Sequence, residues 1–266
     1  MKVFLHIGLG RSGSDFLQKK IFSNLLNVNY FDRYNSKKFD KFRINLFYNP
    51  FFNLKKKEKF EIKSNSLIST ENFFNSDYKL NELIIKIKEV YKKPQIILIL
   101  REPFSHLISL YKYSVQNGLL WRSLDETFDF EKTRRARNVS NNIIFYKNFY
   151  NYKLLIRFLK KNFTKVEIFK FEKIFSSYEE MKKFVSFTEK KFGFKYKSRF
   201  LKKDFYKINP SSNNFIIQKK RIFNFKKDNN NFFLKEINKL YFKNFYSLKF
   251  KKKFINSLEF DYEKLF

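Results

Sequence analysis

The chain has 266 residues, with 57 lysines and arginines against 25 aspartates and glutamates, and a formal net charge of +32. It has no cysteine and two histidines, which excludes disulfides, thiolate metal sites and cysteine nucleophiles and argues against a histidine-rich metal site. The surplus of lysine, asparagine and phenylalanine is the composition expected of an AT-rich genome, so the charge alone does not indicate a nucleic-acid partner.

Membrane and targeting segments are not expected. The first predicted strand begins at residue 2 or 3, which leaves no room for a signal peptide. The longest clean apolar run, residues 96–100, is far shorter than the roughly 20 residues of a membrane-spanning helix. We therefore expect a cytoplasmic protein without a transmembrane segment, forming one domain over residues 1–266.

The chain opens with a buried strand over residues 3–7, a turn with three glycines, and a helix from Ser14 or Asp15 to about residue 26. Glycines let backbone N–H groups approach a ligand closely, because no β-carbon blocks the way. The start of a helix adds further N–H groups and the positive end of its dipole. This stretch therefore predicts an anion site, most often one for phosphate.

Four segments follow before the middle of the chain. A short strand over residues 28–31 ends at Asp32, and residues 32–65 form an irregular region with short helices that we interpret as the acceptor side. A strand over residues 67–71 ends on Glu71, and an amphipathic helix spans residues 78–91.

Residues 95–100 are the clearest strand in the chain, apolar throughout as in a central parallel strand. This strand leads into Arg101, and a helix starts near residue 104. After it we predict a loop over residues 121–137, a helix over residues 142–161, a strand over residues 165–171 and a helix over residues 177–192. Two further helices, over residues 214–226 and 229–245, precede a basic tail.

Strands that alternate with helices predict an α/β fold, a mostly parallel central sheet flanked by helices, with a helical C-terminal part. Such sheets bind ligands outside the carboxyl ends of their strands. Arg11, Glu71 and Arg101 all lie at or just past the ends of predicted strands, so we expect them at that edge.

Two familiar phosphate loops fit the glycine turn in part. Residues 8–13 satisfy G-x-G-x-x-G, and Asp32 lies about 20 residues further on, as in a dinucleotide-binding fold. The same residues satisfy the glycine spacing of a P-loop, but Ser14 and Asp15 stand where its lysine and metal-binding hydroxyl belong. A triphosphate site is therefore disfavoured, while an NAD(P)-dependent oxidoreductase of the Rossmann type stays an alternative.

A third interpretation uses more residues. The strand, the loop with Arg11, Ser12 and Gly13, and the helix resemble the 5′-phosphosulfate loop of sulfotransferases that use 3′-phosphoadenosine 5′-phosphosulfate (PAPS). That family has a second motif, a strand that ends in arginine with a serine eight residues later on the next helix. Arg101 and Ser109 match it, including the preceding strand. The resemblance implies a P-loop-like sulfotransferase architecture that transfers a sulfuryl group to a hydroxyl acceptor.

The resemblance also implies roles for individual residues. Residues of the opening loop would hold the 5′-phosphosulfate: Arg11, Ser12, Gly13, Ser14, Asp15 and Phe16. Arg101 and Ser109 would bind the 3′-phosphate, Arg11 would stabilise the leaving group, and Glu71 would be the catalytic base. No metal is implied. The acceptor would be a saccharide or another small or surface molecule, with no nucleic-acid partner, and the sequence is silent on oligomeric state.

Some residues have competing interpretations. His106 is the second candidate for the base, expected to face outward, and Asp32 is the third. His6 is expected to be a core histidine with its hydrogen bonds satisfied. Asp15 stands where the family has threonine or serine, and we expect it to cap the helix N-terminus. Lysines alternate with aromatic residues over residues 219–253, so a protein that binds nucleic acid or an anionic membrane is a further alternative.

Overall fold

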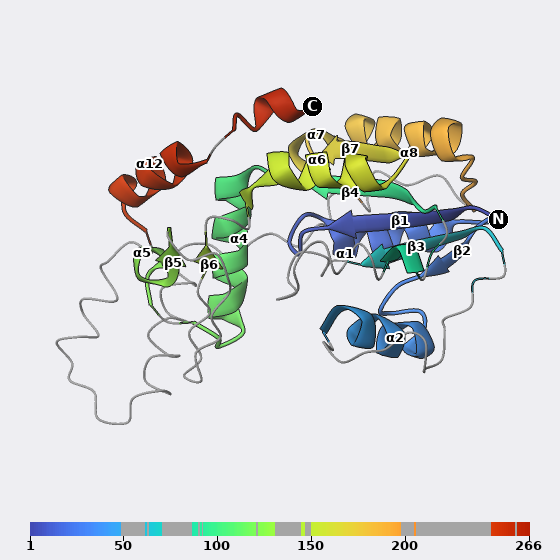
Figure 1. The fold of residues 1–266 in the computed structure, drawn as a ribbon, viewed down its shortest axis with the longest axis horizontal. Coiled ribbons are helices and arrows are strands. Elements are labelled where there is room, and N and C mark those ends of the chain that lie inside the picture. The colour runs from blue at the N-terminus through green and yellow to red at the C-terminus, as the bar shows by residue number, and fades with distance from the viewer. Residues whose placement is uncertain are drawn as a thin grey trace. The chain divides into compact units, whose positions relative to one another are not determined.

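A computed structural model of the chain describes residues 1–48, 62, 64–70, 87–89, 91, 93–120, 122–130, 145–146, 150–197, 205, 246–258 and 260–266. The chain divides into two compact units (Figure 1). The first contains residues 1–102, 154–208 and 266, and the second contains residues 103–153 and 209–265. The expectation of a single domain over residues 1–266 stays a prediction.

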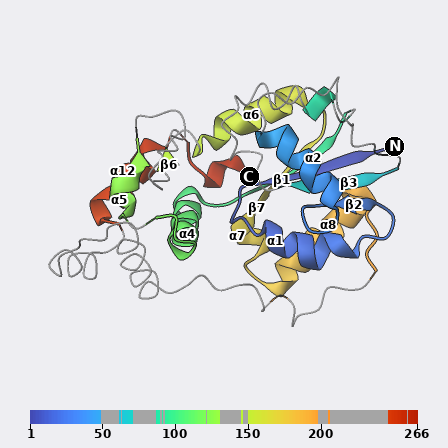
Figure 2. The same ribbon diagram turned by 90° about the horizontal axis from the view of Figure 1, so that it is seen from below.

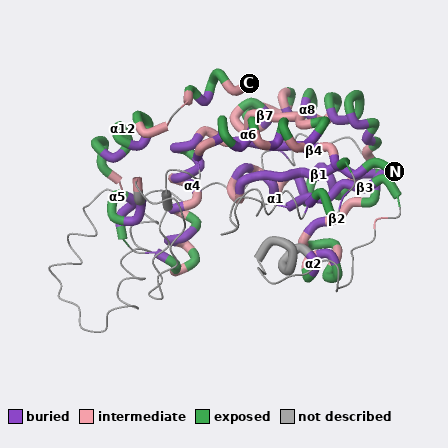
Figure 3. Tube along the Cα trace, viewed as in Figure 1, coloured by how far each residue is buried: buried purple, intermediate pink, exposed green. Residues whose placement is uncertain are grey.

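The first unit is built on a parallel sheet of five strands in the order β2-β3-β1-β4-β7. The strands are β1 (Val3–Gly8), β2 (Asn29–Phe31), β3 (Ser66–Thr70), β4 (Gln95–Leu100) and β7 (Val166–Lys170). Every residue of β1 is buried, as are five of the six in β4, because both strands are central and covered on both faces (Figure 3). The predicted fold class is confirmed.

Helices cover both faces of this sheet, and Figure 2 shows α6 (Tyr152–Asn162) on the opposite side from α1 and α8. The first helical segment is α1 (Ser14–Phe16), continued by a π-helical turn, η1 (Leu17–Ile21), and a 3₁₀ turn, η2 (Phe22–Asn24). Its predicted span is close to the observed one, but it is not a regular α-helix.

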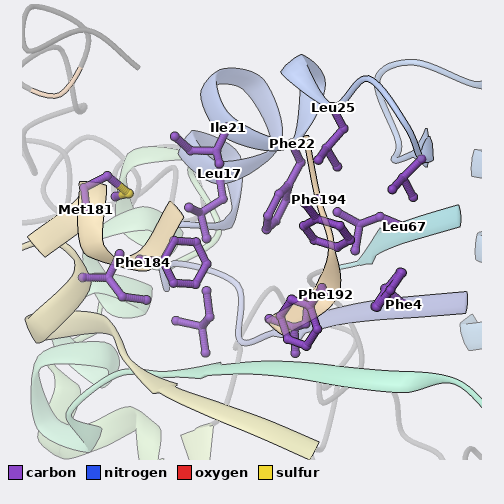
Figure 4. Close-up of a cluster of buried hydrophobic side chains, with 14 of the residues drawn as sticks. Phe4, Leu17, Ile21, Phe22, Leu25, Leu67, Met181, Phe184, Phe192 and Phe194 are labelled. Carbon is purple, nitrogen blue, oxygen red and sulfur yellow. The ribbon is translucent and has the colours of Figure 1, made fainter. Parts of the chain in front are cut away.

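The core between these helices and the sheet is aromatic and aliphatic. Helix α8 (Tyr178–Phe192) begins at Ser177, whose hydroxyl accepts a hydrogen bond from Glu180 N, as a helix cap does. Its buried face meets side chains of β1, β3 and the first helical segment (Figure 4). Phe187 of the same helix is 37% exposed, and its ring packs edge-on against those of Phe169 and Phe192.

Two further elements of this unit are helices α2 (Lys37–Tyr48) and α7 (Phe171–Ile174). Helix α2 lies in the region predicted to be irregular with short helices. Helix α7 begins directly after β7, so the predicted strand over residues 165–171 ends one residue early.

The second unit contains α4 (Pro103–Gln116), α5 (Leu124–Thr127), β5 (Phe128–Asp129), β6 (Phe145–Tyr146), α12 (Leu248–Ser257) and η4 (Glu263–Leu265). The helix predicted over residues 142–161 is wrong at its start, because residues 145–146 pair with β5 as a strand. The helices predicted over residues 214–226 and 229–245 lie outside the described residues.

Helix α12 occupies part of the predicted basic tail. Its Phe250 and Phe254 are buried against Phe128, while its lysines lie on the exposed face. The alternation of lysine and phenylalanine in this helix is therefore the pattern of an amphipathic helix, and these two rings are not available to stack on nucleic-acid bases. Within the part of the chain that is described, no helix has the length and apolarity needed to cross a membrane.

Candidate functional site

The glycine turn after β1 lies at the carboxyl edge of the sheet. Strands β1, β3, β4 and β7 are all parallel, so the segments that follow them emerge at one edge. Residues of three of these segments contact one another: the loop at residues 8–13, Arg101 after β4, and α7 after β7. The edge predicted from the sequence to hold the ligand is therefore the place where these groups meet.

Arg101 contacts the loop directly. Its Nη1 donates a hydrogen bond to the carbonyl oxygen of Arg11 over 2.8 Å, and its guanidinium carbon lies 4.7 Å from the ring centre of Phe171. The backbone after Arg101 is also fixed, because Glu102 N donates to Glu172 Oε1 over 2.9 Å. The structure thus brings the Arg101 side chain to the backbone of Arg11, which lies 90 positions earlier in the sequence.

The loop itself has a left-handed backbone at two positions, Arg11 with φ of 72° and Gly13 with φ of 76°. Ser12 N donates to the Leu9 carbonyl over 3.0 Å, which closes the turn. The Ser12 backbone N–H is therefore used within the loop and is not directed at a ligand.

Aromatic rings explain why residue 13 is glycine. A β-carbon at this position would lie 2.4 Å from Phe175 Cζ and 3.0 Å from Phe171 Cε2. The two rings pack on one another with centres 4.6 Å apart, and Phe16 packs edge-on against Phe175. Sequence reasoning missed Phe171 and Phe175. The sequence feature that could have pointed to these two residues is their position directly after the last strand of the sheet.

Several buried polar atoms of the loop region have no hydrogen-bond partner among the described residues: Ser12 Oγ, Ser14 Oγ and Thr70 Oγ1. Buried hydroxyls without partners are costly and rare in folded proteins. Their position at the edge where the loop and β3 end fits a ligand that accepts hydrogen bonds, such as a phosphate or sulfonate oxygen.

Asp15 does not cap the helix. Gly13 occupies the cap position, and no side chain there makes a capping hydrogen bond. Asp15 Oδ1 instead accepts hydrogen bonds from Arg33 Nη2 over 2.7 Å and from the Tyr34 hydroxyl over 2.6 Å. Burial, followed by this bond to Asp15, raises the pKa of Tyr34 to about 12. Arg33 neutralises the carboxylate that the loop carries, and sequence reasoning missed it.

Asp32 is committed to its own turn. It is buried, Oδ1 accepts from the backbone N–H groups of Tyr34 and Asn35, and Oδ2 accepts from the Tyr30 hydroxyl over 2.6 Å. Strand β3 also separates β2 from β1. A dinucleotide-binding fold places the strand after the first helix next to the first strand, so this order argues against that alternative and against Asp32 as a base.

His6 is buried, as expected, but only one of its ring nitrogens is satisfied. Nδ1 lies 2.7 Å from Ser69 Oγ, which also accepts from Gln18 Nε2 over 2.9 Å. Nε2 is buried without a partner among the described residues. Burial lowers the pKa of His6 to about 3, so the ring is neutral at physiological pH.

The other predicted residues lie elsewhere or outside the description. His106 does not face outward: in the second unit it is fully buried, with Nδ1 3.2 Å from the Tyr150 hydroxyl. Ser109 lies in α4 of the same unit and is buried. Glu71 is outside the described residues. It follows Thr70, which pairs in register with Ile7, one residue before the loop begins.

Comparison with known proteins identifies the fold. A sulfotransferase from Alicyclobacillus acidocaldarius aligns with a TM-score of 0.53 at 14% identity, over 95% of this chain and 99% of that one. Mouse sulfotransferase SULT7A1, in a structure complexed with PAP, aligns with a TM-score of 0.40 at 14% identity, over 96% of this chain and 82% of that one. No family model matches the sequence, and neither does any curated protein. The chain therefore has a sulfotransferase-type fold, established from structure alone.

Proposed function

We propose that the protein is a PAPS-dependent sulfotransferase that acts on a hydroxyl acceptor. The observation that carries the proposal is the meeting of Arg101 with the Arg11 loop at the carboxyl edge of a sulfotransferase-type sheet. Two arginines from adjoining segments of this edge suit a ligand with two separate phosphate groups, because each guanidinium offers a planar pair of donors. A bisphosphorylated nucleotide is such a ligand.

In this proposal the loop binds the 5′ end of the nucleotide. The N–H groups at the start of the first helical segment and the hydroxyls of Ser12 and Ser14 hold the 5′-phosphate. Arg11 stabilises the charge that develops on the bridging oxygen as the sulfur–oxygen bond breaks. Arg101 binds the 3′-phosphate together with Ser109. No metal ligand is required for any of these contacts.

The acceptor hydroxyl needs a group to take its proton. We assign this role to Glu71, the residue after β3 in the sequence, because β3 runs parallel to β1 and ends at the same edge. The acceptor oxygen attacks sulfur in line with the departing oxygen, its proton passes to the Glu71 carboxylate, and 3′-phosphoadenosine 5′-phosphate (PAP) leaves. Positioning and charge stabilisation supply most of the rate enhancement in such displacements. A saccharide hydroxyl is the acceptor class we propose.

Thermal unfolding in the presence of PAP, NAD, ATP and a short single-stranded oligonucleotide tests the proposal. PAP alone should stabilise the protein, by about 2.7 kcal/mol at a concentration 100 times its Kd. Stabilisation by NAD without PAP would favour an oxidoreductase. A response to the oligonucleotide that disappears steeply with salt, with none to PAP, would favour nucleic-acid binding.

A further inference from the structure

The unpartnered nitrogen of His6 lies beneath the phosphate loop. His6 and Gly8 point to the same side of β1, because side chains alternate along a strand. A β-carbon on Gly8 would lie 2.8 Å from Ser14 Oγ and 3.8 Å from His6 Nε2. We call these three groups, Gly8, Ser14 Oγ and His6 Nε2, the Gly8 corner. Two buried polar atoms that have no hydrogen-bond partner among the described residues therefore lie near the position where the chain has no side chain.

The other side of the ring is held by a chain of hydrogen bonds. Gln18 Nε2 donates to Ser69 Oγ, and Ser69 lies opposite His6 in the register of β1 and β3. Ser69 Oγ also lies 2.7 Å from His6 Nδ1, and in the tautomer that we assign here it directs its own hydrogen to this nitrogen. A neutral imidazole that accepts at Nδ1 carries its hydrogen on Nε2. In this tautomer Nε2 is a donor that faces the Gly8 corner.

We propose that His6 is a positioning residue of the phosphate loop, whose Nε2–H orients the Ser14 hydroxyl as a donor to the 5′-phosphate of the nucleotide. When Ser14 Oγ accepts from Nε2–H, its own hydrogen turns toward the loop and the anion. Such contacts are often long in a ligand-free protein and tighten in the complex. This inference rests on the proposed function, and it assigns the ring no proton transfer.

Two substitutions test the roles of the two ring nitrogens of His6 separately. The amide of His6→Gln reaches the position of Nε2 and loses the contact with Ser69, whereas the amide of His6→Asn keeps the position of Nδ1 and loses Nε2. Calorimetric titration with PAP, alongside the melting temperature of each variant, compares them. His106→Asn is the matched control, because that histidine is equally buried and lies in the other unit.

We expect His6→Asn to weaken PAP binding at least tenfold, His6→Gln to stay within about threefold of the wild type, and His106→Asn to bind as the wild type does. Equal affinities for both His6 variants, or tighter binding by His6→Asn, would overturn the inference. If the wild type does not bind PAP, the proposed function itself fails, and the two failures are thereby distinguished.

Nitrogen NMR of the wild-type protein tests the same inference and does not depend on whether any variant folds. The chain has two histidines, so two pairs of ring nitrogens are observed. We expect hydrogen on Nε2 of His6, and a shift of that resonance when PAP is added while His106 is unchanged. Hydrogen on Nδ1 of His6, or a His6 spectrum that PAP does not alter, contradicts the inference.

Discussion

Arg101 Nη1 donates a hydrogen bond to the carbonyl oxygen of Arg11 over 2.8 Å and so ties the end of β4 to the loop after β1. The acceptor is a peptide carbonyl in a left-handed turn, with φ of 72° at Arg11. Left-handed backbone is costly for a residue with a β-carbon and is found where the surroundings enforce it. Arg101 therefore has two tasks in our account, support of the loop and binding of the 3′-phosphate.

Arg11→Asn should separate function from stability. Asparagine tolerates left-handed backbone better than arginine, so we expect the free energy of unfolding to stay the same or rise by up to about 1 kcal/mol. PAP affinity should fall at least tenfold, because a cation at the 5′-phosphate is lost. Urea denaturation and calorimetry measure the two quantities. An equal loss of stability and affinity would show that Arg11 is a structural residue.

Gly13→Ala and Gly193→Ala form a matched pair. Both glycines are left-handed, with φ of 76° and 72°. A β-carbon at Gly13 would collide with Phe175, whereas nothing lies within 4 Å of one at Gly193. We expect about 1 kcal/mol of destabilisation at Gly193, from backbone strain alone, and about 2–4 kcal/mol with loss of PAP binding at Gly13. Similar unfolding free energies for the two variants would mean that the Phe171 and Phe175 rings move aside in Gly13→Ala.

Asp15→Ser tests the charge at the loop. The Asp15–Arg33 pair is partly exposed, with 45% and 35% of the side chains accessible, so its loss should cost less than about 1 kcal/mol. Removing a carboxylate beside the phosphate site should leave PAP affinity equal or higher, and this gain should shrink as salt is added. A lower affinity for Asp15→Ser in titrations at low salt would instead make Asp15 part of the binding machinery.

The stability of the protein should depend on pH through His6. Burial lowers the pKa of His6 from 6.5 to about 3, so the unfolded chain binds a proton between these values that the folded chain does not. This contribution to stability is fully present above pH 6.5 and is lost as the pH falls toward 3, by up to about 1.4 kcal/mol per pH unit. His6→Gln should flatten the slope in urea denaturation series from about pH 7 to 4.5. Parallel slopes for the two proteins would contradict the assignment.

The sequence was most informative where burial alone decides the structure. The apolar run of β4 had the predicted bounds, residues 95–100, because no polar residue offers an alternative pattern. The loop and Arg101 were placed at one edge by the rule that parallel strands end together. The prediction was wrong for Asp15 and His106, whose partners Arg33 and Tyr150 are distant in sequence and follow no local pattern.

The helix predicted over residues 142–161 failed for a related reason. Residues 145–146 form a strand because they pair with β5, and pairing partners cannot be recognised from local periodicity. The rings that pack against Gly13 were missed likewise, since only the folded sheet brings α7 to the loop.

The central claim is that Arg101 and the loop bind different phosphates of one nucleotide. Titration of the wild type and Arg101→Ala with PAP and with AMP, which lacks the 3′-phosphate, tests it directly, with the exposed Arg157→Ala as the control. We predict that Arg101→Ala lowers the affinity for PAP roughly 10- to 100-fold more than it lowers the affinity for AMP. Arg157→Ala should change neither affinity. Equal losses for PAP and AMP would contradict the claim, because Arg101 would then only support the loop.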